Sequence, residues 1–118
     1  MAKELKNELT QQEVRDIFGA LYKDLDDAYW SATTIVDKDR ISGIQGAVFD
    51  ILTELNKAHI KSNTEKFKEL ISTVNNVNKR LDMLKKDIDK IIHKIDVATR
   101  VAKTVDKVLT QAVKYFKI

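Results

Sequence analysis

Apolar residues recur at heptad spacing, alternately three and four positions apart, along the C-terminal half of the chain. Two series of residues seven positions apart interleave, first Phe67, Val74, Leu81, Ile88, Ile95, Ala102, Leu109 and Phe116, and second Leu70, Val77, Leu84, Ile91, Ala98, Val105 and Ala112. This pattern is typical of helices that pack along a coiled-coil seam. It predicts a long helix over residues 63–117, with a kink near 75–78 left open because three asparagines gather there.

The apolar stripe of this helix widens toward the C-terminus. Around residues 78–87 its flanks are polar, which suits a single facing helix, whereas from Ile92 onward valines and other apolar residues join it. The wide part must contact more than one helix, and the preceding helices are the nearest candidates, with another chain or a lipid interface as alternatives. The residues predicted to form the packing seam are Leu81, Leu84, Ile88, Ile91, Ile95, Val101, Val105, Val108 and Leu109.

Two shorter amphipathic helices are predicted before the long one. Thr10 and Glu13 fit a capping box, so the first helix should run over about 11–36, followed by a turn at about 37–39 and a second helix at about 40–61. The chain has no proline and three glycines in 118 residues, too few turn residues for a sheet protein. We therefore expect one all-α domain, an elongated helical hairpin or bundle with a long heptad-patterned C-terminal helix. How many helices residues 40–117 form stays open.

The sequence shows no arrangement of residues that is typical of catalysis or of metal binding. There is no cysteine, and neither His59 nor His93 belongs to a metal-binding or acid–base motif. No glycine-rich phosphate loop follows a strand. The sequence therefore predicts a protein that is not an enzyme, with no catalytic residues, no metal site and no cofactor.

Charge is distributed unevenly along the chain. The net charge is +3, but residues 1–40 carry six basic and nine acidic groups, whereas residues 81–118 carry nine basic and five acidic groups. Opposite the seam, a basic ridge with His93 at its centre provides candidate partner contacts at Lys79, Lys86, Arg100, Lys107 and Lys114. A solvated face is the commonest reason for such lysines, and an acidic protein partner or a membrane surface is the alternative. Aspartates beside the ridge make nucleic acid an unlikely ligand.

Tyr29 and Trp30 form an adjacent aromatic pair, and both are candidate partner contacts. If the chain turns at 37–39, antiparallel counting places them near Gly46 and Gly43. The absence of a side chain at these glycines would allow an aromatic ring to approach closely, so Trp30 should be shielded from water. If Trp30 is exposed instead, it becomes the best candidate for contact with an outside partner.

These patterns favour a non-enzymatic interaction or assembly module that acts through coiled-coil-like helix surfaces and forms homo-oligomers or binds a protein partner. The alternative is a membrane-active protein, similar to helical toxins or lysis factors, in which the basic amphipathic segment Val97–Ile118 lies at a lipid interface. With no signal peptide and no apolar run long enough to span a bilayer, the expected location is cytoplasmic, and export by a signal-less route stays open.

Overall fold

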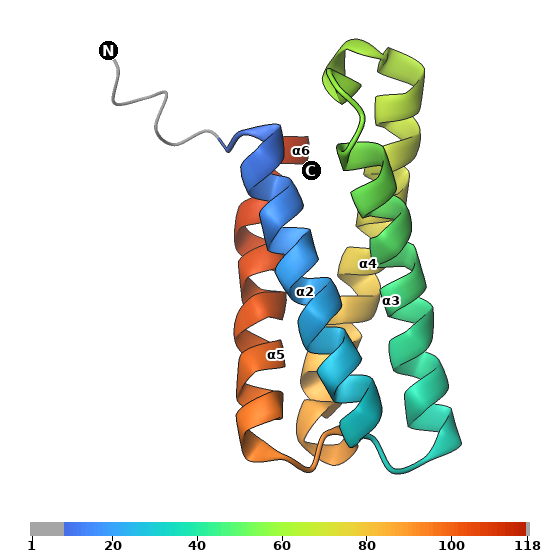
Figure 1. Cartoon of the computed structure of the whole chain (residues 1–118), viewed down its shortest axis with the longest axis vertical. Coiled ribbons are helices and arrows are strands. Elements are labelled where there is room, and N and C mark those ends of the chain that lie inside the picture. The colour runs from blue at the N-terminus through green and yellow to red at the C-terminus, as the bar shows by residue number, and fades with distance from the viewer. Residues whose placement is uncertain (1–8, 118) are drawn as a thin grey trace.

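The computed structural model describes residues 9–117, and in these residues the chain forms four long helical segments and no strand (Figure 1). The first two segments are α2 (Gln11–Ser31) and α3 (Ile35–Leu55), and a short 3-10 turn, η1 (Ile60–Ser62), leads to α4 (Thr64–Ile91). The fourth segment consists of α5 (Ile95–Lys107), the π-helical stretch η2 (Val108–Ala112) and α6 (Val113–Phe116). The predicted all-α helical bundle is thus confirmed.

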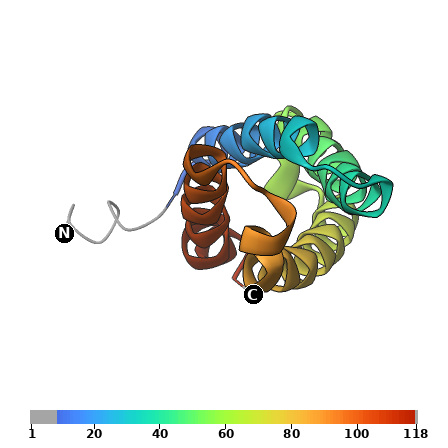
Figure 2. The ribbon, with the colours of Figure 1, turned by 90° about the horizontal axis from the view of Figure 1, so that it is seen from below.

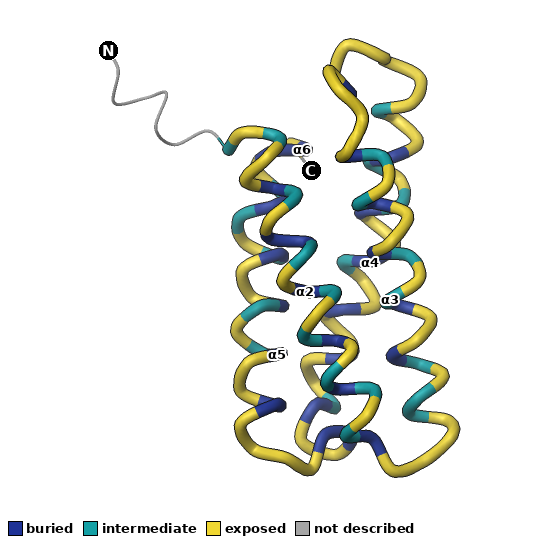
Figure 3. Tube along the Cα trace, viewed as in Figure 1, coloured by how far each residue is buried: buried dark blue, intermediate teal, exposed yellow. Residues whose placement is uncertain are grey.

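The four segments pack as an up-and-down ring around one apolar core. Each long helix contacts the next one in the sequence, and α5 also contacts α2, which closes the ring (Figure 2). Buried positions recur along every helix at the spacing that places them on its inner side (Figure 3). All the buried side chains belong to a single cluster, so the helices stabilise one another rather than separate units.

The first turn lies earlier than the predicted position at 37–39. Helix α2 ends at Ser31, and α3 begins at Ile35, after Thr34 has capped it by accepting a hydrogen bond from the backbone N–H of Asp37. Asp37 therefore lies in the first turn of α3, where a carboxylate is favoured by the positive end of the helix dipole. The Thr34 cap thus starts α3 before Asp37 and Asp39, the residues that suggested a turn.

The second predicted helix also ends earlier than expected, at Leu55 rather than near 61. In the connection that follows, the exposed His59 has a left-handed backbone conformation, with φ of 55°, directly before η1, so the chain does not continue as one helix to 61. Asn63 then caps α4, its side chain accepting from the N–H of Lys66. The predicted start of the long helix at about 63 agrees with this cap.

The prediction of one helix over 63–117 is wrong, because the chain leaves the helix at Ile92, with φ of −108° and ψ of 111°. An uninterrupted helix would be roughly 80 Å long, whereas the longest dimension of the fold is 47 Å. By reversing at residues 92–94, the chain places α5 against both α2 and α4, which covers its wide apolar face. Asn75, Asn76 and Asn78 lie within α4, which continues through them without a break.

Aromatic side chains gather in the core at the end of the bundle where α6 lies. Phe67 of α4 stacks on Phe116 with a centroid distance of 5.8 Å, and Phe18 of α2 meets the same ring edge-on at 6.4 Å. Tyr115 packs edge-on against Phe67, and its burial raises the pKa of its hydroxyl group. This cluster connects the C-terminal segment to α2 and α4.

Candidate interaction surface

An aromatic face, consisting of Tyr22, Tyr29 and Trp30 of α2 and Phe49 of α3, runs along the junction of these two helices. The Tyr22 and Phe49 rings lie 6.1 Å apart, and Tyr29 meets Trp30 edge-on at 5.3 Å. Both tyrosines are half-buried, but Trp30 is 73% exposed and Phe49 is 55% exposed. Large aromatic side chains contribute disproportionately to binding energy when a partner covers them. This face is therefore the first candidate for a contact surface.

Lys38 contacts Tyr29 and Trp30, at the exposed end of this face. Its ammonium group lies 4.7 Å from the centre of the Tyr29 ring and 5.5 Å from that of the Trp30 ring, within the range of a cation–π interaction. The same group donates a hydrogen bond to the Tyr29 carbonyl at 2.7 Å. Lys38 therefore packs against both rings and restrains the aromatic pair.

The expected packing of Trp30 on the α3 glycines does not occur. A Cβ at Gly46 would have no atom within 4 Å, and one at Gly43 would meet only the Arg80 side chain, at 3.8 Å. The prediction failed because it depended on the turn at 37–39. The indole of Trp30 is largely exposed, so Trp30 becomes a candidate for contact with an outside partner, as expected for an exposed Trp30.

The outward side of α3 beside this face carries no charge over residues 41–49, although a third of the residues in the chain are charged. Its exposed residues between Asp39 and Asp50 are Ser42, Gly43, Gly46 and Phe49. Glycine in an exposed helix costs about 1 kcal/mol relative to alanine. Gly46 makes the outward surface of α3 flat, with no atom within 4 Å of a Cβ placed there, whereas Gly43 lies at the groove with α4, beside Arg80 and Met83.

Bulky apolar residues are also exposed at the end of the bundle that holds the loops before α3 and α5, seen end-on in Figure 2. Ile35 and Val36 begin α3 and are 78% and 75% exposed, and Ile95 begins α5 and is 83% exposed. Ile95 was predicted to lie in the packing seam, and this prediction is wrong. The reversal at 92–94 makes Ile95 the first residue of α5, at the end of the bundle, where its side chain is exposed. Of the other seam residues, Leu109 is half-buried, and the following are buried: Leu81, Leu84, Ile88, Ile91, Val101, Val105 and Val108.

The basic ridge is split by the same reversal. Lys79 and Lys86 lie on α4, whereas Arg100, Lys107 and Lys114 lie on the returning segment, so the five do not form one line. Lys86 lies 3.9 Å from Asp82 of its own helix. Arg100 donates a hydrogen bond to Asp27 of α2 at 2.9 Å, which raises the pKa of its guanidinium group. Arg100 thus connects α5 to α2.

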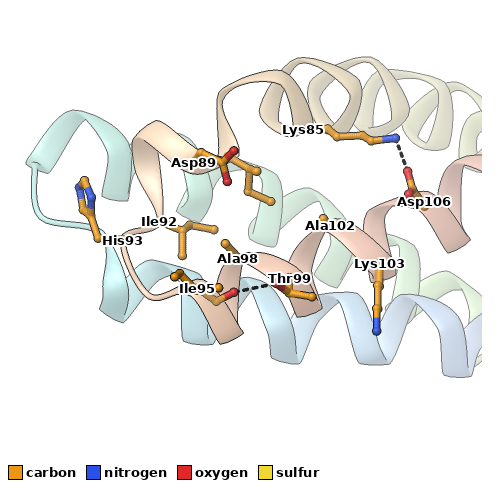
Figure 4. Close-up of a pocket in the computed structure, with 11 residues that line it drawn as sticks. Lys85, Asp89, Ile92, His93, Ile95, Ala98, Thr99, Ala102, Lys103 and Asp106 are labelled. Carbon is orange, nitrogen blue, oxygen red and sulfur yellow. Dashed lines mark hydrogen bonds and ion pairs between the residues drawn. The ribbon is translucent and has the colours of Figure 1, made fainter.

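A groove of about 620 Å³ lies between α4 and α5. Figure 4 shows Ile92, Ala98 and Ala102 between the two helices, with an ion pair between Lys85 and Asp106 at one end of the groove. Ile88 also lines it, so the floor is apolar and the rim is charged. Sequence reasoning missed this groove because it arises only when the chain folds back on itself; no local pattern indicates it.

Within residues 9–117, no three histidine or acidic side chains come together in a way that would hold a metal ion. No helix in the same part of the chain combines the length and the apolarity needed to cross a bilayer. Comparison of the chain with family models, with curated proteins and with solved structures finds no match.

Proposed function

We propose that this chain is a non-enzymatic interaction module that binds a protein partner through the aromatic face of α2 and α3. The observation that carries the proposal is the exposure of Trp30 and Phe49 on helices whose other large apolar side chains are mostly in the core. The solvent-exposed area of an indole brings no burial energy to the fold, whereas covering it in a complex removes a large apolar area from water.

Two neighbouring features support this assignment. The uncharged outer side of α3 lets a partner approach without desolvating charged groups, which is costly when they lose their partners. The Lys38 contacts restrain the Tyr29 and Trp30 rings, so less side-chain entropy is lost on binding. Together they give aromatic anchors beside an uncharged stretch of helix, a combination typical of the centre of protein interfaces, on a pair of helices that also carries exposed carboxylates.

The proposal is tested by site-specific photo-crosslinking in cells. The photoreactive amino acid p-benzoylphenylalanine replaces Trp30 or Phe49, and in the control it replaces Ala58, which is exposed in the connection between α3 and α4, at the other end of the bundle from Trp30. We expect protein adducts from positions 30 and 49 and none of the same mass from position 58. If neither aromatic position yields a protein adduct while circular dichroism shows an intact fold, the proposal is wrong.

The membrane-active alternative requires the apolar side of residues 97–118 to meet lipid. In the fold, four of the five valines of this segment, Val97, Val101, Val105 and Val108, are buried, and Val113 is half-buried. Lipid insertion would therefore have to open the bundle and expose its core. Co-sedimentation with anionic vesicles tests this alternative: binding accompanied by loss of the native near-ultraviolet signal would favour it over a folded interaction module.

A further inference from the structure

The two sides of the bundle carry opposite charge. Residues 11–55, which form α2 and α3, contain four basic and nine acidic residues, a net charge of −5. Residues 64–117, which form α4 to α6, contain thirteen basic and seven acidic residues, a net charge of +6. We name these halves the acidic side and the basic side. They lie on opposite sides of the ring in Figure 2.

Ion pairs within the chain neutralise only part of this asymmetry. Arg40 of α3 pairs with Asp87 of α4 at 3.0 Å, and Arg100 of α5 pairs with Asp27 and Asp24 of α2. Asp26, Asp39 and Asp50 stay exposed on the acidic side. The exposed cations of the basic side include Lys90, Lys94, Lys103 and Lys107. Each side thus retains a surplus of its own sign.

The acidic side and the basic side also differ in shape. The acidic side carries the exposed indole of Trp30, and the basic side carries the groove between α4 and α5. Trp30 is near the end of α2, and the groove extends to Ile92 and Ile95, so both lie near the same end of the bundle (Figures 1 and 4). With a volume of about 620 Å³ and an apolar floor, the groove is large enough for an aromatic side chain.

We propose that the partner is a second copy of this chain, with the acidic side of one copy on the basic side of the next and Trp30 in the groove between α4 and α5. This inference rests on the proposed function. A contact between two acidic or two basic sides would bring like charges together, whereas the acidic-to-basic contact pairs opposite charges. The two longest dimensions of the fold are 47 and 30 Å, so a broad side exceeds the roughly 800 Å² that each partner contributes to a standard interface.

Such an interface uses different surfaces on the two copies and does not close by two-fold symmetry. After each addition, the assembly still has a free acidic side at one end and a free basic side at the other. Assembly therefore continues into a ring or a filament. Because the attraction is between surface charges, assembly should weaken when ionic strength rises from about 0.05 M to about 0.5 M, as the Debye length shortens. These two properties separate this mode from an apolar two-fold dimer.

Variants that block one side at a time provide the decisive experiment. Trp30→Glu blocks the acidic side, and Ala102→Glu, or Lys103→Glu as a second choice, blocks the groove. We expect sedimentation velocity at low salt to show assemblies larger than a dimer for the parent and for the control Ala58→Glu, which changes an exposed position between α3 and α4, outside both sides. Each blocked variant alone should be monomeric, with self-association weakened at least ten-fold, while circular dichroism shows an intact fold.

Mixing the two blocked variants gives the sharpest outcome. Each retains the surface that the other has lost, so an equimolar mixture of the Trp30→Glu and Ala102→Glu chains should form a dimer that grows no further. A mixture that stays monomeric, or a parent that is monomeric at every concentration, would overturn the self-assembly. If crosslinks from position 30 then contain a different protein, the proposed function stands and only the identity of the partner is wrong.

Discussion

Ile88 and Met83 lie five residues apart on α4, yet Ile88 is 7% exposed and Met83 is 61% exposed. The difference follows from helix geometry, because five residues correspond to about 500° of rotation at 3.6 residues per turn. Ile88 belongs to the side that faces the core, and Met83 points away from it. Similar apolar side chains on one helix therefore contribute very differently to the stability of the fold.

This contrast predicts opposite results for the same substitution. Ile88→Asp places a carboxylate in an apolar site and should lower the free energy of unfolding by about 3 kcal/mol or more. Met83→Asp, the matched control, should change it by less than about 0.5 kcal/mol. Urea denaturation followed by circular dichroism measures both. Equal stability of the two variants would show that Ile88 does not lie in the core.

At the scale of the element, α3 combines a buried apolar side with an outer side of small residues. The core side consists of Ile41, Ile44, Val48, Ile51 and Leu55. The outer side has glycines where an exposed helix would favour alanine or a charged residue. Helix propensity alone therefore does not account for the sequence of α3.

Substitution of Gly46 tests whether this position is open in the isolated chain. Gly46→Ala should raise the free energy of unfolding by about 0.5–1 kcal/mol, because the added methyl group meets no atom within 4 Å and alanine favours helix. Gly43→Ala should have the same sign, with its methyl group in ordinary contact with Arg80. Thermal unfolding measures both effects. Low protein concentration and high salt prevent self-assembly, so the result reports on the isolated chain. A loss of stability in Gly46→Ala would mean that another group already packs there.

At the scale of the whole molecule, the C-terminal segment depends on the first two helices. Val101, Val105 and Val108 are fully buried, and α5 packs against α2 as well as against α4. The hydrogen bonds from Arg100 to Asp27 and from Thr104 to Asp24 also join α5 to α2. Without α2 and α3, two antiparallel helices would leave much of this apolar surface in water.

A fragment of residues 63–118 should therefore fail to fold as a monomer. We expect it to bind the dye ANS more strongly than the full chain, to unfold without a cooperative transition and to aggregate as its concentration rises. Size-exclusion chromatography with light scattering, at a salt concentration that suppresses assembly of the full chain, provides the comparison. A monomeric fragment with a cooperative thermal transition would contradict this dependence.

The periodicity of apolar residues determined the all-α class and most of the core, because burial of one side of a helix requires a spacing that is visible in the sequence. The spacing of Thr10 and Glu13 also identified the capping box, because it is a local interaction between residues three positions apart. The same periodicity could not locate the reversal at 92–94. A heptad repeat that continues through a loop is equally compatible with one long helix and with two helices that share a core.

The tertiary structure decided where the chain folds back, and with it which surfaces remain exposed. The reversal after Ile91 buries the wide face of α5, separates the basic ridge and creates the groove between α4 and α5. The earlier turn at 32–34 leaves Trp30 in solvent and exposes Gly46. The physical reason is that loop positions here depend on how much apolar surface several helices cover together, a property of their packing that no single segment of sequence contains.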